Sequence, residues 1–292
     1  MNQRRIRLAL VYRFARFFPD RKLLELLFPL RTGYSLNLDH PQTFNEKLQW
    51  LKLHDYRSEY TRMVDKVEAK RFVAEIIGEE YIIPTLAVYD SADEIDFDLL
   101  PDQFVLKCTH DSGSVVVCRD KRMLNQATAL KKLKQGLKRN YFHENREYPY
   151  KYVTPRIIAE KYMSDPQHEE LNDYKIYCFG GEPRYCQVIS DRRRRKSMDF
   201  FDTEWQHQPF HKTKEYPFAE RMPSRPVNYA KMLELSGRLS AGIPFLRVDF
   251  YEIEGRLYFG ELTFYPASGM GGFSPMEWDY KFGELIHLPE KP

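Results

Sequence analysis

The sequence predicts an α+β protein in which a helical N-terminal part precedes two regions of antiparallel sheet. Apolar residues recur at helical spacing through residues 43–77. After Pro101 this pattern gives way to short runs rich in Val, Tyr, Phe and Leu, which are typical of strands. Gly-Gly at 180–181 and Glu-Gly at 254–255 each separate two such runs, which predicts two β-hairpins. With 292 residues the chain can bury a full core, in one large domain or in two or three lobes.

Composition and charge narrow the class of protein. Charged residues make up 30% of the chain and no apolar run approaches membrane-spanning length, so we expect a soluble, cytoplasmic protein. The net charge of +3 is small, and we expect no nucleic-acid partner. The four cysteines (Cys108, Cys118, Cys178 and Cys186) show no C-x-x-C spacing and lie in strand-like runs. They are interpreted as buried reduced thiols.

Residues 1–40 are predicted to form a basic helical arm, with one or two helices closed by Pro29. The arginines of residues 4–16 interrupt its apolar core, which is too short and too charged for a signal peptide or a transmembrane helix. Such a helix can lie peripherally on the anionic inner surface of a membrane. Alternatively it packs on the body with its arginine stems along apolar surface. Because the arginines do not gather on one helical face, we favour packing.

Residues 41–100 are predicted to form a helical or α+β lobe. Thr43 followed by Glu46 is a capping-box pattern and predicts a helix over residues 43–52. A second amphipathic helix is expected over residues 63–77, where the next residue is a glycine. A short strand around Pro84 and an acidic loop before Pro101 complete this part.

Residues 101–163 are predicted to form a second α+β lobe. Residues 104–118 have the pattern of a strand, a small polar loop and a strand. Lys107 lies in the first strand, where a lysine is costly unless it faces water or an anion. The loop that follows has small residues whose N–H groups can surround phosphates, although it is not a Walker A loop. An ordinary exposed hairpin is the alternative interpretation.

The same lobe continues with a lysine-rich helix over residues 125–139 and a buried strand over residues 157–163. Glu160 and Lys161 interrupt the apolar pattern of that strand. The strand is either a hinge that reads an adenine edge, with Glu160 accepting from the exocyclic amine, or an edge strand whose charges face water.

Residues 164–292 are predicted to form a third part, with a hairpin over 173–189, a short strand over 200–205 and a helix over 228–241. Lys175, in the first strand of the hairpin, could place a second positive charge on a phosphate. Residues 190–196 read S-D-R-R-R-R-K and form a basic loop. Its arginines (Arg192, Arg193, Arg194 and Arg195) are expected to bind a polyanionic acceptor, and a solvated turn is the alternative.

The hairpin of residues 246–263 carries the strongest chemical signal. A three-residue loop would place Asp249 opposite Glu261 and Arg247 opposite Thr263 on one face. Two carboxylates this close suit Mg²⁺, and an arginine beside them suits a phosphate or a carboxylate. A two-residue turn would shift the register and split the cluster. A solvated face of alternating charge is the alternative interpretation.

The order of these parts resembles the ATP-grasp fold, in which two α+β lobes clamp ATP between them. The chain is similar to one branch, the TupA-like ATP-grasp family associated with teichuronopeptide and capsular polysaccharide synthesis. The resemblance runs from about Thr43 to the C-terminus. It rests on T-F-N-E-K-L-Q-W-L, V-D-K, F-V-L-K-C-T-H-D-S-G, I-I-A-E-K-Y-M, D-Y-K-I-Y-C-F-G-G-E-P and L-R-V-D-F-Y…G-E-L-T-F-Y-P.

The resemblance implies ATP and Mg²⁺ as cofactors and a role for each matched residue. It implies that Lys107 and Lys175 bind phosphates and that Arg247 lies near the transferred phosphate. It implies a phosphate loop at His110, Asp111, Ser112, Gly113 and Ser114, an adenine hinge at Glu160, Lys161, Tyr162 and Met163, and Mg²⁺ ligands at Asp249 and Glu261. Thr263 stands where many ATP-grasp ligases have Asn, a better metal ligand, which puts a second metal site in doubt. The ribose-binding acid stays open among Asp165, Glu169 and Glu170.

The expected activity is that of a carboxylate–amine ligase that forms an acyl phosphate and modifies a cell-surface polysaccharide or its precursor. The expected substrates are a uronic acid, an amino acid or a glycan. A kinase or transferase of polysaccharide synthesis, and a non-catalytic nucleotide-binding protein, are the alternatives, since a fold does not fix a reaction.

Overall fold

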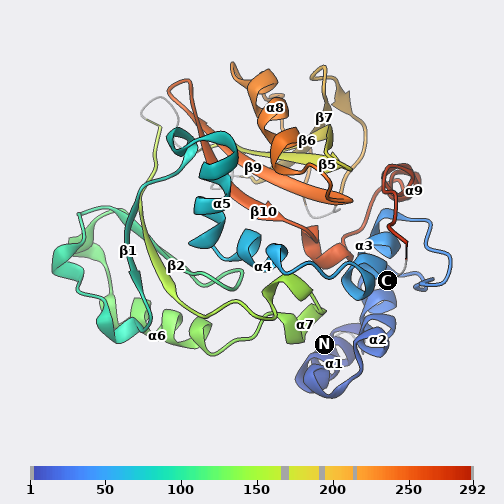
Figure 1. The fold of residues 1–292 in the computed structure, drawn as a ribbon, viewed down its shortest axis with the longest axis horizontal. Helices are drawn as coiled ribbons and strands as arrows, with labels where there is room; N and C mark the ends of the chain where they lie inside the picture. The colour runs from blue at the N-terminus through green and yellow to red at the C-terminus, as the bar shows by residue number, and fades with distance from the viewer. Residues whose placement is uncertain (1–2, 166–170, 191–194, 213–215, 291–292) are drawn as a thin grey trace.

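Two antiparallel sheets and a helical arm make up the computed structural model, which describes residues 3–165, 171–190, 195–212 and 216–290 (Figure 1). Within these residues the smaller sheet has four strands in the order β1-β4-β2-β3. The larger sheet has six strands in the order β10-β9-β5-β6-β7-β8. The predicted α+β class is therefore confirmed, whereas the boundaries at residues 40, 100 and 163 stay a prediction.

The arm consists of α1 (Gln3–Phe14), a 3₁₀ turn and α2 (Asp20–Thr32). Its core is formed by apolar side chains of α2 with Ala15 and Met270. The prediction that Pro29 closes the arm is wrong, because Pro29 lies inside α2. Its carbonyl still accepts the N–H of Gly33 at 3.1 Å, and the helix ends there because Gly33 adopts a left-handed φ of 90°. Within the described residues no helix is long and apolar enough to cross a membrane.

The next helices are α3 (Phe44–His54), α4 (Glu59–Val64) and α5 (Glu68–Ile77). The predicted capping box of α3 is confirmed: Thr43 Oγ1 accepts the N–H of Glu46 at 3.1 Å, and Glu46 Oε2 accepts the N–H of Thr43 at 3.0 Å. The single helix predicted over residues 63–77 is wrong, since Asp65 interrupts it and accepts the N–H of Val67 at 2.8 Å.

The four-stranded sheet is formed by β1 (Thr85–Tyr89), β2 (Phe104–Cys108), β3 (Val115–Cys118) and β4 (Ile157–Lys161). Helix α6 (Gln126–Leu137) packs on one of its faces, and the short α7 (Phe142–Asn145) follows. In β2 the even-numbered residues are buried in this core, whereas Val105 and Lys107 point to the opposite face. Because β4 lies between β1 and β2, the edge-strand interpretation of residues 157–163 is excluded.

The six-stranded sheet is formed by β5 (Asp173–Phe179), β6 (Glu182–Ser190), β7 (Ser197–Asp202), β8 (His207–Gln208), β9 (Phe245–Ile253) and β10 (Arg256–Thr263). The hairpin predicted over residues 173–189 is confirmed, whereas the strand predicted over 200–205 begins and ends three residues earlier. Helices α8 (Tyr229–Leu239) and α9 (Glu277–Glu284) pack with this sheet into the largest core.

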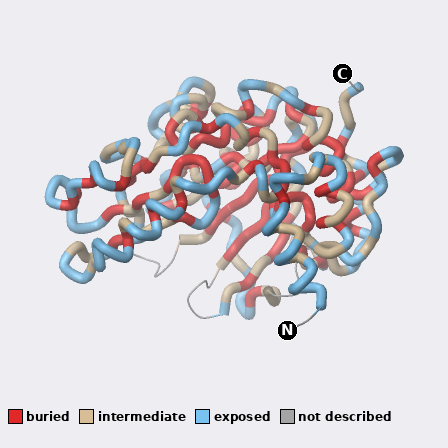
Figure 2. The backbone as a smooth tube through the Cα atoms, turned by 90° about the horizontal axis from the view of Figure 1, so that it is seen from below, coloured by how far each residue is buried: buried red, intermediate tan, exposed pale blue. Residues whose placement is uncertain are grey.

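Most buried residues lie in the two sheets, whereas the exposed residues are concentrated in the connecting loops and the arm (Figure 2). All four cysteines are free and buried, as the sequence predicts.

Candidate active site

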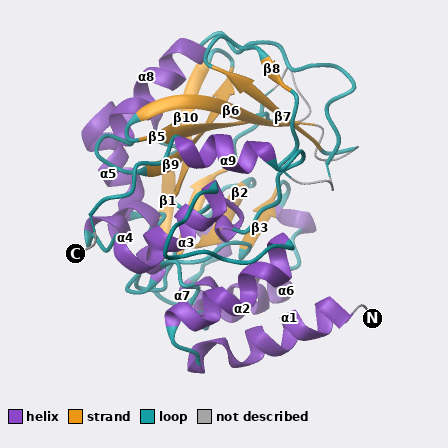
Figure 3. Cartoon of the chain, turned by 90° about the vertical axis from the view of Figure 1, so that its right-hand side faces the viewer, coloured by secondary structure: helices purple, strands orange, loops and turns teal. Residues whose placement is uncertain are grey.

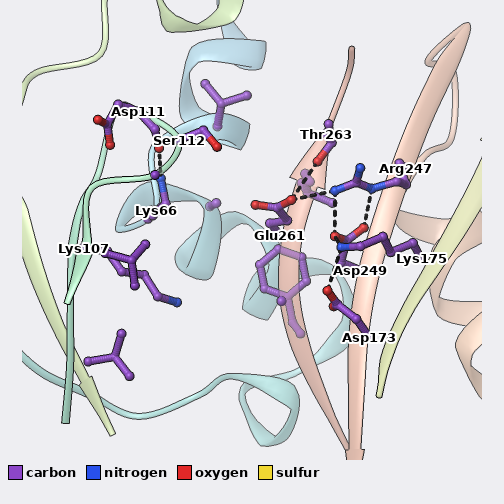
Figure 4. Close-up of a pocket in the computed structure, with 18 of the residues that line it drawn as sticks. Lys66, Lys107, Asp111, Ser112, Asp173, Lys175, Arg247, Asp249, Glu261 and Thr263 are labelled. Carbon is purple, nitrogen blue, oxygen red and sulfur yellow. Dashed lines mark hydrogen bonds and ion pairs between the residues drawn. The ribbon is translucent and has the colours of Figure 1, made fainter. Parts of the chain in front are cut away.

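A cavity of about 930 Å³ lies between the two sheets (Figure 4). One wall consists of residues from β2, β3, β4 and the loop after β2. The opposite wall consists of residues from β5, β9 and β10, while Lys66, before α5, and Ala69 and Lys70, in its first turn, also line the cavity. The cavity therefore lies where the sequence predicts that two lobes meet, and its size suits a nucleotide-sized ligand.

Lys107 on β2 points into this cavity, and its ammonium group pairs with Glu160 Oε2 at 2.6 Å. Lys70 pairs with the other oxygen of the same carboxylate. Burial alone would raise the pKa of Glu160, but the two lysines outweigh it and lower that pKa. Glu160 therefore stays ionised and holds both ammonium groups at the wall. Its predicted contact with adenine stays a prediction.

The loop between β2 and β3 presents only its middle to the cavity. Asp111, Ser112 and Gly113 line the cavity, and within the described residues the N–H groups of Ser112 and Gly113 have no protein acceptor. Gly113 has a φ of 100°, which an L side chain rarely adopts. His110 and Ser114 are buried behind the loop: His110 Nε2 contacts the carbonyl oxygen of Gly136 at 3.2 Å. Both residues support the loop and do not face the cavity.

Lys66 is a functional candidate that the sequence did not identify as one. Its ammonium group donates to the carbonyl oxygen of Asp111 at 2.6 Å, and its N–H donates to the carbonyl oxygen of Thr109 at 3.2 Å. The break between α4 and α5 at Asp65 is what turns Lys66 toward this loop. The V-D-K motif at residues 64–66 was the signal, but a lysine in a predicted helix looks like a solvated residue.

The predicted hinge also lies on the cavity wall. Lys161, Tyr162 and Met163 follow Glu160 along the wall, and Asp165 lies two residues further on. Of the three candidate ribose-binding acids, Asp165 is the one that the structure places at the cavity, because Glu169 and Glu170 lie outside the described residues.

The hairpin of β9 and β10 brings Asp249 and Glu261 into direct opposition, but not through the predicted loop. Its turn has two residues, Glu254 and Gly255, with φ values of 49° and 73°. Such a turn alone would pair Asp249 with Gly260. A β-bulge between Phe259 and Glu261 adds one residue to β10 and restores the predicted register.

Charges alternate tightly around this pair (Figure 4). Arg247 donates to Asp249 Oδ1 at 2.6 Å and to Glu261 Oε1 at 2.6 Å. Lys175, opposite Asp249 on β5, pairs with Asp249 and with Asp173 Oδ2 at 3.0 Å. The Glu261 side chain is 52% exposed into the cavity, but the protein around the cavity keeps the carboxylate from bulk water, which by itself would raise its pKa. Arg247, Lys175 and Lys66 outweigh this effect and lower the pKa to about 2. Glu261 is therefore ionised throughout the physiological range.

The donor set of this hairpin fits Mg²⁺. Asp249 and Glu261 supply hard carboxylate oxygens on facing strand positions, and the Thr263 hydroxyl donates to Glu261 Oε1 at 3.2 Å. The described residues contain no group of three or more His, Cys, Asp or Glu side chains that could hold a metal ion. Mg²⁺ commonly binds one or two carboxylates and takes its other ligands from phosphates and water.

The predicted basic acceptor loop is not part of the described cavity. Arg192, Arg193 and Arg194 lie outside the described residues. Arg195 is exposed, pairs with Glu220 at 3.4 Å and does not line the cavity.

Two lobes built on antiparallel sheets, with cationic side chains facing across the cavity between them, define an ATP-grasp fold. A family model described as TupA-like ATPgrasp matches residues 46–287, and the chain belongs to this TupA-like ATP-grasp family. No curated protein matches the chain.

Solved structures with a similar fold are distant in sequence. D-alanine–D-alanine ligase from Bacillus anthracis in complex with ATP is 16% identical, with a TM-score of 0.39, and the match covers 70% of this chain and 54% of that one. The Helicobacter pylori ligase is 13% identical with a TM-score of 0.39, and the match covers 78% of this chain and 61% of that one. ATP-grasp ligase PsnB, complexed with its minimal precursor, is 8% identical with a TM-score of 0.38 over 70% of this chain and 54% of that one. This chain thus spans little more than half the length of those structures.

Proposed function

We propose that the chain is an ATP- and Mg²⁺-dependent carboxylate–amine ligase that acts through an acyl phosphate. Membership of the ATP-grasp family supports ATP as the phosphoryl donor. The observation that carries the proposal is the convergence of charged groups from both walls: Lys66 and Lys107 on one side, Lys175 and Arg247 with two carboxylates on the other. Phosphoryl transfer depends on such positioning and charge neutralisation.

In this proposal each wall has its own task. Lys107 and the N–H groups of Ser112 and Gly113 bind phosphate oxygens, and the backbone of residues 161–163 holds the adenine edge. Asp249 and Glu261 would hold Mg²⁺, which would supply neutralisation of the negative charge on the transferring phosphoryl group. Arg247 releases part of its contact with these carboxylates and stabilises the transferred phosphoryl group beside the acceptor carboxylate.

The proposed acceptor is an acidic cell-surface glycan or its precursor, such as a uronic acid joined to an amino acid or an amino sugar. The choice of a cell-surface glycan rests on the resemblance to a family associated with polysaccharide synthesis. The site supports an acidic acceptor, because a cavity lined by cations suits an anion.

The test is to incubate the chain with ATP, Mg²⁺ and a panel of uronic acids and amines, to measure ADP and phosphate release, and to weigh the products by mass spectrometry. A ligase gives ADP, free phosphate and a product lighter than its two substrates together by one water. ADP with a phosphorylated acceptor would instead show a kinase. Tight ATP binding without turnover on any pair would show a nucleotide-binding protein.

A further inference from the structure

The cavity continues past the hairpin of β9 and β10 to a second end that the nucleotide roles leave unused. This end is formed by the arm, by α7 and the turn that follows it, and by the 3₁₀ turn Pro266–Gly269. Its lining includes Tyr12, Arg31, Asn145, Glu147, Tyr150 and Ser268. Two of these residues belong to the arm, before the first residue of the family match. A cavity of about 930 Å³ lies near the upper end of the roughly 300–1,000 Å³ range of ligand pockets, which leaves space for a second substrate.

Arg31 is the cation of this second end. In the part of the chain that the structure describes, its guanidinium group donates to three neutral acceptors: the Tyr12 hydroxyl at 3.3 Å, Asn145 Oδ1 at 3.5 Å and the carbonyl oxygen of Ala267 at 3.3 Å. All three contacts are longer than a typical N–H···O hydrogen bond. Among the described residues Arg31 has no ion pair. A guanidinium group with only long neutral contacts, at the wall of a cavity, suits an incoming carboxylate that it can bind through two N–H groups.

The neighbouring charges are already matched to each other. Glu147 is buried and accepts a hydrogen bond from Ser268 Oγ at 2.6 Å. Lys52 is buried on the same side and donates to the carbonyl oxygens of Asn145 at 2.9 Å and Ser268 at 2.8 Å. Glu147 and Lys52 act on each other electrostatically, so their charges compensate within the protein. Arg31 also acts electrostatically on Glu147, which lines the cavity, but among the described residues no carboxylate forms an ion pair with Arg31.

The turn that faces Arg31 is held in an unusual conformation. Ala267 and Ser268 have φ values of 52° and 57°, which residues other than glycine rarely adopt. Lys52 holds the carbonyl oxygen of Ser268, and Gln49 Nε2 donates to that of Gly269 at 2.7 Å. The buried polar groups of α3 thus fix the turn that places a carbonyl oxygen beside Arg31.

Tyr150 connects this end of the cavity to the proposed reaction centre. Burial and the carboxylates of Glu147 and Glu261 raise the pKa of Tyr150, while Arg247 acts in the opposite direction. The phenol therefore lies within electrostatic reach of both ends and stays protonated, as a neutral hydrogen-bond donor. A small substrate anchored at Arg31 can extend along Tyr150 toward Arg247.

We propose that Arg31 anchors the carboxylate of the amine substrate, so that the amine substrate is an amino acid. This inference rests on the proposed ligase function. The amine nitrogen attacks the acyl carbon of the acyl phosphate, and a C–N bond forms. The C–O bond to the phosphate breaks, and phosphate leaves with the electron pair and takes up one proton from the nitrogen. Arg31 takes no part in these bond changes and acts by binding alone.

The test compares amines that differ only in the carboxylate: glycine with methylamine, and alanine with ethylamine. With each acid of the panel, the parent is expected to have a KM at least tenfold lower for the amino acid than for the matched amine. Arg31→Gln is expected to remove this difference, to leave KM for ATP unchanged, and to be partly rescued by Arg31→Lys. Arg5→Gln, which changes an exposed arginine of the same arm, is the control and is expected to match the parent.

Equal use of amino acid and amine by the parent, or an Arg31→Gln variant that keeps the preference, would overturn the inference. If no pair is ligated at all, the proposed function fails, and calorimetry then tests the anchor separately. A panel of free amino acids is titrated into the chain saturated with a non-hydrolysable ATP analogue. Binding that is present in the parent and lost in Arg31→Gln supports the anchor, whereas the absence of binding in the parent overturns it.

A separate surface of the arm carries a second inference. Helix α1 is the outermost helix of the molecule in Figure 3 and has two apolar faces. Leu8, Val11 and Tyr12 pack against the core of the arm, which confirms the packed arrangement that the sequence favours. Ile6, Leu10 and Phe14 are 39%, 52% and 48% exposed, and at 100° per residue they lie within about 80° of one another on the opposite face. Phe17, 68% exposed, follows in the next turn.

Charge decides what covers this face. The chain has five arginines and no Asp or Glu before Asp20. Arg5, Arg7, Arg13 and Arg16 make no ion pair with a described residue, and helical spacing places Arg7 and Arg13 at the two borders of the apolar face. A second copy packed on the same face would bring like charges together. We infer that α1 docks on an anionic membrane surface, with its apolar face in the headgroup region and its arginines on acidic lipids.

The test is co-sedimentation of the full chain with vesicles of phosphatidylcholine alone and with 30% phosphatidylglycerol. The parent is expected to bind the anionic vesicles, less strongly as salt rises, and to leave the neutral vesicles unbound. Leu10→Ser/Phe14→Ser and Arg7→Gln/Arg13→Gln are each expected to weaken binding at least tenfold. The control Met123→Ser/Val227→Ser changes residues that are 83% and 89% exposed elsewhere and is expected to bind like the parent. Equal binding to both vesicles, unaffected binding in the arm variants, or a dimer that the Leu10→Ser/Phe14→Ser change dissolves would overturn the inference.

Discussion

Asp249 and Glu261 face each other on adjacent strands because one extra residue in β10 compensates for the short turn at the end of the hairpin. A Cβ atom at Gly260 would lie 3.1 Å from the carbonyl oxygen and 3.3 Å from the Cβ atom of Asp249. Any side chain at residue 260 would therefore have to displace Asp249 by a few tenths of an ångström, which would disturb the alignment of the two carboxylates.

We expect Gly260→Ala to lower turnover about tenfold or more, since the added methyl group displaces Asp249, and displacements of about 1 Å at a reaction centre can cost 10²-fold. The measurement is kcat with saturating ATP and Mg²⁺, alongside the melting temperature. Gly272→Ala is the matched control, because a Cβ atom there meets nothing within 4 Å. Equal kcat in both variants would show that the bulge does not position the site.

The two carboxylates are expected to respond differently when their charge is removed. Glu261→Gln should abolish Mg²⁺-dependent turnover while the fold is kept, since its side chain is 52% exposed. Asp249→Asn should abolish turnover and also lower the free energy of unfolding, by about 3–5 kcal/mol, because it leaves Lys175 and Arg247 buried without their shared partner. Urea unfolding separates the two effects. Turnover within a few-fold of the parent in both variants would exclude these residues from the mechanism.

Local patterns predicted most of the fold, because capping, alternation and turn chemistry are encoded within a few residues. The capping box at Thr43, the hairpin at residues 180–181 and the strand that carries Lys107 all appear in the structure. The break at Asp65 was missed because an aspartate that accepts a nearby N–H competes with the helix without altering the apolar period.

The candidate site was predictable only where residues share a strand or a hairpin. The sequence correctly predicted that Asp249 lies opposite Glu261, but it attributed this register to a three-residue loop. The true cause is the bulge, and its only sign in the sequence is a glycine inside a strand. Arg31 was not identified, because the arm and the turn at Ala267 meet only through tertiary packing. Helical and strand periodicity relates residues that are close in the sequence, so it cannot predict a contact between residues as far apart as Arg31 and Ala267.

Lys107→Ala is expected to weaken ATP binding by about 1.5–3 kcal/mol, since it removes a charge-assisted contact with a phosphate. Adenosine has no phosphate, and its affinity should change little. Calorimetry with both ligands makes the comparison, and Lys131→Ala, at an exposed position of α6, is the control. Equal ATP affinity in the parent and Lys107→Ala would refute the phosphate role of this lysine.

Lys212 provides a prediction about stability and pH. Its ammonium group is buried 4.3 Å from the ring centre of Phe44 and 4.8 Å from that of Phe273, and within the described residues it has no hydrogen-bond partner. Burial lowers its pKa from 10.5 to about 7. Between these two values the unfolded chain binds more protons than the folded one, so this lysine makes stability rise as pH increases from about 7 to 10.5.

Lys212→Met keeps the length of the side chain and removes the charge. We expect it to raise the free energy of unfolding at pH 7 by about 1–4 kcal/mol, since an apolar residue replaces a buried ion. This stability difference between Lys212→Met and the parent should become smaller toward pH 10. There the amine of Lys212 is already partly neutral in the unfolded chain, so folding releases fewer protons. Urea unfolding at pH 7 and pH 10 measures both values, and Lys281→Met, at an exposed position of α9, is the control. The same gain at both pH values would show that Lys212 does not titrate on folding.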